Sequence, residues 1–407
     1  MPFRIVDQST LKQIFTSLRS KNYRLYFYGQ GISLIGTWIQ NIALSWLIYR
    51  LTGSVFLLGL VGFTTQIPTF ILTPFTGVIT DRYDRMAIMR SAQVLFMIHA
   101  FVMAFLVLSG HIEVWHIIAL SIVFGVINAF DAPARQSLVI DLIDDPKNLG
   151  NAIALNSAIF NGARLVGPAI AGMLIAVVGE GVCFLINAFS FIFVIGALWQ
   201  IKILKERVAP PEKDFKKSFF EGLRYTFGTK EIRNLILLLG VMSLTAFPSI
   251  VLLPAYAKEI LHGGADTLGF LMSALGAGAL VGALYMASRK STKGLENIIT
   301  VTTLILSAMI SLTGVTSSMW LALLSLSVGG VTMILTLSSI NTLLQTTTEE
   351  RMRGRVMSFY AMALMGTQPI GNLIAGSVAS GIGIHWTMVI GGAVTFIAGI
   401  VWKSLSV

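Results

Sequence analysis

The sequence predicts an all-α protein that crosses a membrane many times. Of its 407 residues, 55% are hydrophobic and only 12% are charged, whereas about a quarter of the residues in a soluble domain are charged. Apolar runs of about 20 residues, the length at which a helix spans the hydrocarbon core, recur along the whole chain. The alternating segments of about ten residues that a membrane β-barrel needs are absent from the sequence. These observations favour a polytopic helical membrane protein.

Hydropathy predicts twelve membrane-spanning helices. They fall near 25–50, 56–80, 88–110, 115–134, 149–178, 182–202, 233–256, 266–287, 296–316, 319–342, 355–379 and 385–403. A charged segment that contains Pro210 and Pro211 separates the first six from the last six. We therefore expect an N-terminal half (1–201), a cytoplasmic linker (202–232) and a C-terminal half (233–407). Before the first helix, the chain is predicted to form a basic amphipathic segment on the membrane surface, not a cleaved signal peptide.

The distribution of basic residues predicts the topology. In this arrangement 26 of the 29 Lys and Arg residues lie on one face of the membrane. Since loops rich in Lys and Arg stay in the cytoplasm, both termini are predicted to be cytoplasmic, with the protein in the inner membrane of a bacterium. The net charge of +10 then reflects topology and does not indicate a nucleic-acid partner, because the basic residues punctuate the apolar spans.

Motifs for catalysis and metal binding are missing from the sequence. Cys183 is the only cysteine, which excludes an intramolecular disulfide or a cysteine-based metal cluster. The run "GAGALVG" (276–282) has the wrong spacing for a nucleotide-binding loop and lies inside an apolar span, where its glycines favour helix packing. We therefore predict no enzyme, no metal and no cofactor.

The two halves resemble each other in the positions of their glycines. An offset of 204 residues places Gly150, Gly162, Gly167 and Gly172 on Gly354, Gly366, Gly371 and Gly376, and an offset of 205 places Gly77 on Gly282. Four coincidences at one offset favour a duplicated six-helix unit. Parallel repeats with the substrate site between them form a known transporter architecture.

Several short motifs carry a family resemblance. The stretch "GVITDRYDRM" (77–86) resembles the signature of the major facilitator superfamily between helices two and three, Gly-x-x-x-Asp-Arg-x-x-Arg. The stretches "NAFDAPARQS", "NAIALNSAIFNGARLVGPAIAG" and "ERMRGRVMS" resemble a bacterial subgroup that exports enterobactin-type siderophores and macrolides. The resemblance covers nearly the whole chain and implies the twelve-helix major facilitator fold, with two pseudo-symmetric halves.

The resemblance also implies a function. A member of this family would be a secondary active exporter that moves a small organic molecule across the cytoplasmic membrane by alternating access. The expected cargo is a siderophore, a drug or another amphipathic compound, and the expected energy source is the proton gradient. We expect a monomer surrounded by membrane lipid. Two alternatives stay open: a lysophospholipid flippase of the same fold, and a non-transporting receptor or assembly partner.

A cytoplasmic gate is implied at the motif. Its residues are Gly77, Asp81, Arg82, Arg85, Asp141 and Arg355. In the family, the carboxylate corresponding to Asp81 caps helix eleven of the other half, where a helix N-terminus stabilises an anion by about 0.3–1 kcal/mol. Arg82 and Arg85 would pair with Asp141 or other acids near the fourth helix. The alternative is that these charges only hold the loop inside. The second half has Met286 in place of the aspartate, so we expect unequal gates.

Polar residues within the spans predict a central cavity. They are Thr37, Gln40, Asn41, Gln66, Asn128, Asp131, Asn161 and Arg164. The stripes on the first two helices carry no charge, which favours a neutral or amphipathic cargo; the alternative is hydrogen bonding between helices. Since a charge at membrane depth costs at least about 2.5–3.5 kcal/mol, we hypothesise that Asp131 pairs with Arg164, in either a functional or a structural role. For His99 we predict a bond to a backbone carbonyl in preference to a proton-carrying role.

Helix five carries the remainder of the candidate site. Exporters of the superfamily have a glycine-rich motif here, and this chain matches it at Gly167, Pro168 and Gly172 but has Ala171 at a glycine position. The resemblance implies a seal that favours export over uptake. Ordinary packing of small residues is the alternative.

Overall fold

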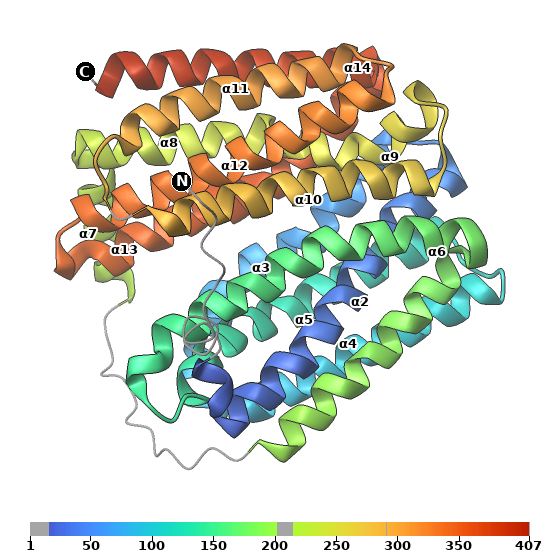
Figure 1. Ribbon diagram of the computed structural model, residues 1–407, viewed down its shortest axis with the longest axis horizontal. Helices are drawn as coiled ribbons and strands as arrows, with labels where there is room; N and C mark the ends of the chain where they lie inside the picture. The colour runs from blue at the N-terminus through green and yellow to red at the C-terminus, as the bar shows by residue number, and fades with distance from the viewer. Residues whose placement is uncertain (1–15, 202–214, 290, 407) are drawn as a thin grey trace, which may run out of the picture.

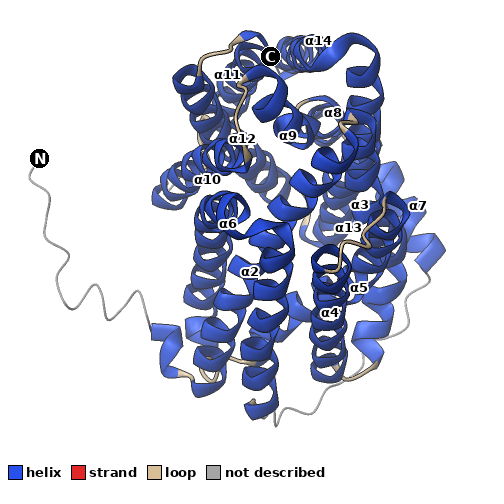
Figure 2. Ribbon diagram, turned by 90° about the vertical axis from the view of Figure 1, so that its right-hand side faces the viewer, coloured by secondary structure: helices blue, strands red, loops and turns tan. Residues whose placement is uncertain are grey.

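The computed structural model describes residues 16–201, 215–289 and 291–406 (Figure 1). The N-terminal half consists of η1 (Thr16–Arg19), α2 (Lys21–Thr52), α3 (Val55–Arg82), α4 (Arg85–Leu108), α5 (Val114–Asp141), η2 (Pro146–Asn148) and α6 (Leu149–Gln200). The remaining elements are α7 (Phe215–Gly228), α8 (Lys230–Thr245), η3 (Phe247–Leu252), α9 (Leu253–Ala255), η4 (Tyr256–Ile260), α10 (Ala265–Ser288), α11 (Leu295–Val315), α12 (Met319–Thr347), α13 (Glu350–Ala361), η5 (Met362–Gly366) and α14 (Thr367–Ser406). Every regular element in the described ranges is helical (Figure 2).

Ten helical runs among the described residues are long and apolar enough to cross a membrane. Two of them, Leu149–Gln200 and Glu350–Leu405, contain 52 and 56 residues. A straight helix of that length would measure about 80 Å, more than twice the hydrocarbon core of about 30 Å. Each run leaves helical geometry at one glycine, Gly179 (φ 77°) or Gly383 (φ 85°), a conformation that glycine adopts without steric cost. In Figure 1, α6 doubles back on itself. Each long run is long enough to cross twice, and the count of twelve crossings stays a prediction.

The seventh predicted span changes helix type along its length. The predicted range 233–256 falls within one candidate membrane span, Lys230–Ile260. Inside it, α8 ends at Thr245 and the chain continues as a 3-10 turn, a short α-helical piece and a π turn. Pro248 and Pro254 account for the break: proline lacks the N–H that would bond to the preceding turn, and its ring clashes with the carbonyl four residues back. In the other half the corresponding first helix, α2, is continuous.

The two halves share a hydrophobic core at one end of the bundle only. We call this the seal end; it carries the turns at Gly53, Gly179 and Gly383. Buried residues of both halves, among them Leu47 and Tyr256, form one cluster there. Toward the other end, which we call the terminal end, one cluster is built from the N-terminal half and another from the C-terminal half. Figure 1 shows the halves as two layers of helices.

Part of the predicted linker is a helix docked on the C-terminal half. Helix α7 lies against α13 (Figure 1). Arg355 forms an ion pair with Glu221 at 2.6 Å, and the rings of Phe219 and Phe359 pack with centroids 5.5 Å apart. Residues 1–15 of the predicted surface segment lie outside the described residues, as does the linker over 202–214. The rest of that segment forms η1 and the start of α2.

Candidate functional site

Two of the predicted seal residues of helix five, Pro168 and Gly172, lie where α6 crosses α10 of the other half. A Cβ atom added to Gly172 would lie 2.8 Å from the carbonyl oxygen of Ala265 and 3.0 Å from the Cα of Gly269. One added to Gly269 would lie 2.8 Å from the carbonyl oxygen of Pro168. Gly167 packs inside its own half, against Trp38. Small-residue packing is therefore present, and at Gly172 it joins the two halves backbone to backbone.

The repeat of this contact joins α3 to α14. A Cβ atom on Gly376 would lie 2.9 Å from both the Cα of Gly59 and the carbonyl oxygen of Val55. Gly376 is the residue that the offset of 204 relates to Gly172. Both copies of the duplicated unit thus use the same glycine to bring the halves together.

Asn372 lies within this second contact and was not among the predicted site residues. Its side chain is fully buried, and a Cβ atom on Gly62 of the other half would lie 3.0 Å from its Nδ2. Neither its Nδ2 nor its Oδ1 has a hydrogen-bond partner among the described residues. A buried polar group without a partner costs about 1–3 kcal/mol. The unpaired amide of Asn372 therefore destabilises the closed seal end, and opening of that end would let water bond to it.

Asn372→Leu is expected to stabilise the closed seal end, because the substitution keeps the approximate volume and removes the unpaired amide. The population with this end open should fall about tenfold. Spin labels at Thr52 and His262, in a Cys183→Ser background, would report the distance across the seal end. Ser377→Ala is the control, since Ser377 bonds only within its own helix, to the Leu373 carbonyl. An open population equal to that of the control would contradict the interpretation.

Side chains add a further link at the seal end. The Tyr49 hydroxyl donates a hydrogen bond to Glu259 of the other half. Next to it, Arg50 donates to both carboxylate oxygens of Glu180, at 2.6 and 3.3 Å, within its own half. Bidentate arginine–carboxylate pairs are among the stronger ion pairs. Arg50 is one of the three Lys and Arg residues that the predicted topology does not place on the cytoplasmic face, and in the structure it forms an ion pair with Glu180.

Several predicted cavity residues bond within the N-terminal half. Gln40 accepts a hydrogen bond from Asn187 at 2.8 Å, and Asn128 donates to Thr69 at 3.3 Å. Thr37 and Asn161 donate to carbonyls of their own helices, at 2.9 Å in both cases. The alternative of hydrogen bonds between helices therefore holds for Gln40 and Asn128. Of the others, Asn41 is exposed and Gln66 is partly buried.

The structure gives Asp131 and Arg164 different partners. Asp131 is 3% exposed; its carboxylate accepts a hydrogen bond from Gln93 at 2.7 Å and lies 3.4 Å from the Nε of Arg135. The guanidinium carbon of Arg164 lies 5.9 Å from the centroid of the Trp38 ring, within reach of a cation–π attraction. The hypothesised pair is thus replaced, in this conformation, by an ion pair one turn along α5.

The structure describes the motif loop in part. Helix α3 ends at Arg82, and Asp84 caps α4 by accepting a bond from the Met86 N–H at 2.9 Å. Arg85 lies 3.7 Å from Asp141, as predicted. The side chains of Asp81 and Arg82, and the surroundings of Gly77, lie outside the described part of the chain, so the contact of Asp81 with helix eleven stays a prediction.

His99 does what the sequence predicted. Its Nε2 lies 3.1 Å from the carbonyl oxygen of Leu120. The ring also packs against Phe124, with centroids 5.6 Å apart. This contact satisfies one ring nitrogen, whereas the other, Nδ1, is buried without a hydrogen-bond partner among the described residues.

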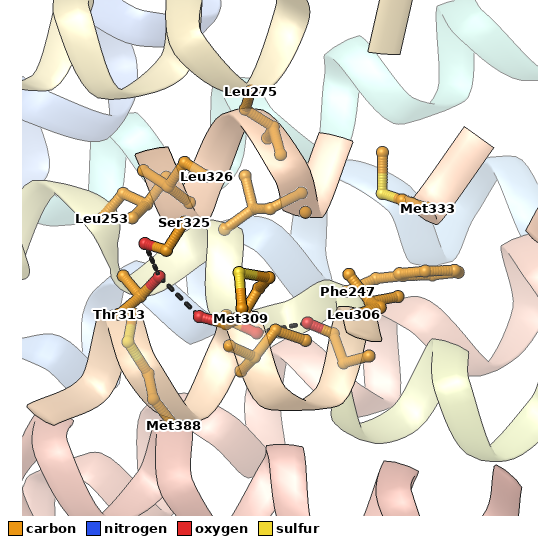
Figure 3. Close-up of a pocket in the computed structure, with 15 residues that line it drawn as sticks. Phe247, Leu253, Leu275, Leu306, Met309, Thr313, Ser325, Leu326, Met333 and Met388 are labelled. Carbon is orange, nitrogen blue, oxygen red and sulfur yellow. Dashed lines mark hydrogen bonds between the residues drawn. The ribbon is translucent and has the colours of Figure 1, made fainter. Parts of the chain in front are cut away.

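A small apolar cavity lies inside the C-terminal half (Figure 3). Its volume is about 40 Å³, and Phe247, Met309, Met333 and Met388 are among its lining residues. Three polar side chains, Ser249, Thr313 and Ser325, also line it, and the last two bond to each other at 2.7 Å. At the matching place in the other half, where an offset of 205 residues puts Phe124 on Gly329, the cavity measures about 10 Å³. The larger cavity has Gly329 where the smaller one has the Phe124 ring. The absence of that ring leaves room beside the seventh span.

An all-helical membrane bundle whose two parts are joined at one end by repeated glycine contacts is typical of a transporter of the major facilitator type. A family model described as a transmembrane secretion effector matches residues 12–407. The chain belongs to this family.

Curated relatives match over almost the whole chain. The staphyloferrin A transporter of Staphylococcus aureus is 25% identical over 91% of this chain and 93% of its own length. Macrolide efflux protein A of Streptococcus pyogenes is 22% identical over 93% and 95%. The multidrug efflux pump Tap of Mycolicibacterium fortuitum is 24% identical over 86% and 88%.

Solved structures support the fold. A bacterial homologue of the human lysosomal transporter Spinster, in an inward-facing conformation, has a TM-score of 0.71 at 14% identity and covers 95% of this chain and 97% of its own. A bacterial homologue of the iron transporter ferroportin, in an inward-facing state, has a TM-score of 0.70 at 19% identity and covers 95% and 98%. At these identities the likeness concerns the fold alone.

Proposed function

We propose that the protein exports a small organic molecule from the cytoplasm by alternating access. The observation that carries the proposal is the asymmetry of contact between the halves: a shared core and repeated glycine contacts at the seal end, and a separate core in each half toward the terminal end. Such an arrangement is suited to two rigid bodies that rock about a site between them. Three relatives are named after what they transport: the staphyloferrin A transporter, macrolide efflux protein A and the multidrug efflux pump Tap.

The cargo is an amphipathic organic compound. In the N-terminal half, the polar groups toward the predicted cavity are mainly uncharged amides and hydroxyls, and Arg164 is paired with an aromatic ring. A surface of this kind combines apolar contact with a few hydrogen bonds, as is common in small-molecule sites. Charged cargoes that need several arginines fit it poorly.

The conformation is inward-facing under this proposal. The distribution of Lys and Arg assigns the terminal end, with both chain termini, to the cytoplasm, and the seal end to the outside of a bacterial inner membrane. A reporter enzyme that is active only outside the membrane, fused after Val407, should remain inactive. Activity of this fusion would reverse the topology, and with it the assignment of export.

Protons are proposed as the coupling ion. Asp131 supports this, as a carboxylate that is 3% exposed within a predicted span, because buried acids in transporters commonly belong to ion or proton pathways. Its partners, Gln93 and Arg135, are available to stabilise the charged form.

Transport in liposomes tests the function. Purified protein should exchange a macrolide, a siderophore or a cationic dye across the membrane faster than protein-free liposomes, and a pH gradient should drive accumulation. A labelled lysophospholipid in the same assay tests the flippase alternative. If no cargo of either class moves in counterflow, a non-transporting receptor or assembly partner becomes the better interpretation.

A further inference from the structure

We propose that a groove between α2 and the last part of α6 binds one anionic phospholipid of the cytoplasmic leaflet. The groove has a volume of about 400 Å³. Its walls are Arg24, Leu25, Tyr28, Gly29 and Ile32 from α2, and Ile192, Phe193, Gly196, Ala197 and Gln200 from α6. It is thus polar at the terminal end and apolar further in.

Two glycines with opposite surroundings create the groove. At Gly29 the helices touch, since a Cβ atom there would lie 2.9 Å from the Cβ of Ala197 and 3.0 Å from the carbonyl oxygen of Phe193. At Gly196 a Cβ atom would meet nothing within 4 Å. The helices therefore cross closely at one point and leave an open floor beside it, where a flexible chain can lie without displacing a side chain.

The dimensions of the groove fit an acyl chain in one leaflet. Arg24 and Ile32 are eight residues apart on α2, which corresponds to about 12 Å along the helix axis. Half of the hydrocarbon core measures about 15 Å. Ile32, Ile192 and Phe193 are 42%, 50% and 57% exposed. Hydrocarbon packed along these side chains would cover apolar surface that the protein itself leaves uncovered.

The charge at the mouth selects the headgroup. Arg24 is exposed, and no ion pair or side-chain hydrogen bond of this residue is found among the described residues. Tyr28, 58% exposed, lies one turn further in. Basic pockets between helices on the cytoplasmic side are the usual sites for anionic headgroups. Arg24 is therefore placed to meet the phosphate, with the Tyr28 ring at the interface.

A neighbouring groove on the other side of α6 is less suited to the same ligand. It is lined by Arg90 and Trp199, but the Arg90 guanidinium donates to the carbonyls of Leu198 and Ile201 at 2.8–3.5 Å. That arginine caps the end of α6. Of these two grooves, the one between α2 and α6 contains the arginine, Arg24, that has no ion pair or side-chain hydrogen bond among the described residues.

The groove is separate from the contact between the halves. Both of its walls belong to the N-terminal half, and Figure 1 shows the last part of α6 on the side away from the C-terminal half. The lipid is therefore a bound partner of the N-terminal half and not a cargo in transit. This inference stands whether or not the proposed cargo is correct.

Native mass spectrometry of the full chain tests the site, with dioleoylphosphatidylglycerol and dioleoylphosphatidylcholine as probes. Wild-type protein should retain phosphatidylglycerol preferentially. Arg24→Gln should weaken its binding about fivefold without changing that of phosphatidylcholine, and Arg24→Lys should keep the preference. Gly196→Leu, which fills the floor, should weaken both lipids roughly tenfold. Lys21→Gln is the matched control: it removes an exposed basic residue from the same helix that does not line the groove.

Three results would overturn the proposal. Equal losses in Arg24→Gln and Lys21→Gln would show that the attraction is a diffuse surface effect. Wild-type binding in Gly196→Leu would place the lipid elsewhere. Competition between phosphatidylglycerol and a transported cargo, seen as displacement of the lipid when cargo is added, would assign the groove to the transport path.

Discussion

Gly172→Leu is expected to force the seal end open and to reduce export roughly 100-fold. A small excess of volume in a close-packed contact costs about 1–3 kcal/mol, and leucine has four more carbon atoms than glycine. At Gly172 the added atoms meet the backbone of α10, at Ala265 and Gly269, which cannot move aside as a flexible side chain would. Only the conformation with this end closed contains the contact, so the penalty falls on that state alone.

The measurement is the distance between spin labels at Thr52 and His262, together with export in liposomes. Gly162→Leu on the same helix is the matched control, because a Cβ atom there meets nothing within 4 Å. Gly376→Leu, at the repeated position, should act in the same direction. Monodisperse Gly172→Leu protein with wild-type distances and export would show that the glycine contact is not part of the switching surface.

The sequence predicted the pieces that depend on local composition. The all-helical membrane fold follows from hydropathy, and the structure confirms it. The spacing of glycines related Gly172 to Gly376, and both form close contacts between helices in the structure. The bond of His99 to a carbonyl was also foreseeable, since a lone imidazole in an apolar span has few other partners. Pro248 and Pro254 carried the signal for the broken seventh span, but uniform hydropathy across 233–256 concealed it.

The sequence does not show which faces of the helices contact each other. Asp131 and Arg164 were equally reasonable partners by charge, yet Arg135 one turn away and Gln93 on α4 are the neighbours that the fold supplies. Asn372 was missed because a single asparagine in an apolar span resembles any other polar residue there. Its burial depends on packing against Gly62 of α3, which lies more than 300 residues away in sequence.

Arg355 is a predicted gate residue with a partner that the sequence did not indicate. The family resemblance implies a place near Asp81, whose side chain lies outside the described part of the chain, and the structure adds an ion pair with Glu221 on α7. Both side chains of this pair are partly exposed, and exposed ion pairs contribute about 0–1 kcal/mol. The pair with Glu221 therefore contributes little to the free energy of folding.

Asp131→Asn is expected to abolish the dependence of transport on the pH gradient, with accumulation of cargo falling about 100-fold while downhill counterflow persists. Asparagine keeps an oxygen that accepts the hydrogen bond from Gln93 and imitates the protonated carboxyl. The protein would therefore cycle without exchanging a proton at this position. The comparison of pH-driven accumulation with counterflow at uniform pH separates this effect from a loss of cargo binding.

The competing explanation is that Asp131 and Arg135 form a structural ion pair. Removing one partner of a buried pair commonly costs about 3–5 kcal/mol, because the other charge is left behind, whereas removing both costs much less. The double variant Asp131→Asn/Arg135→Gln discriminates between the two roles. If Asp131 carries the proton, the double variant should regain thermal stability and counterflow but not pH-driven accumulation. Full recovery of accumulation in the double variant would make the pair structural and move the proton pathway to another residue.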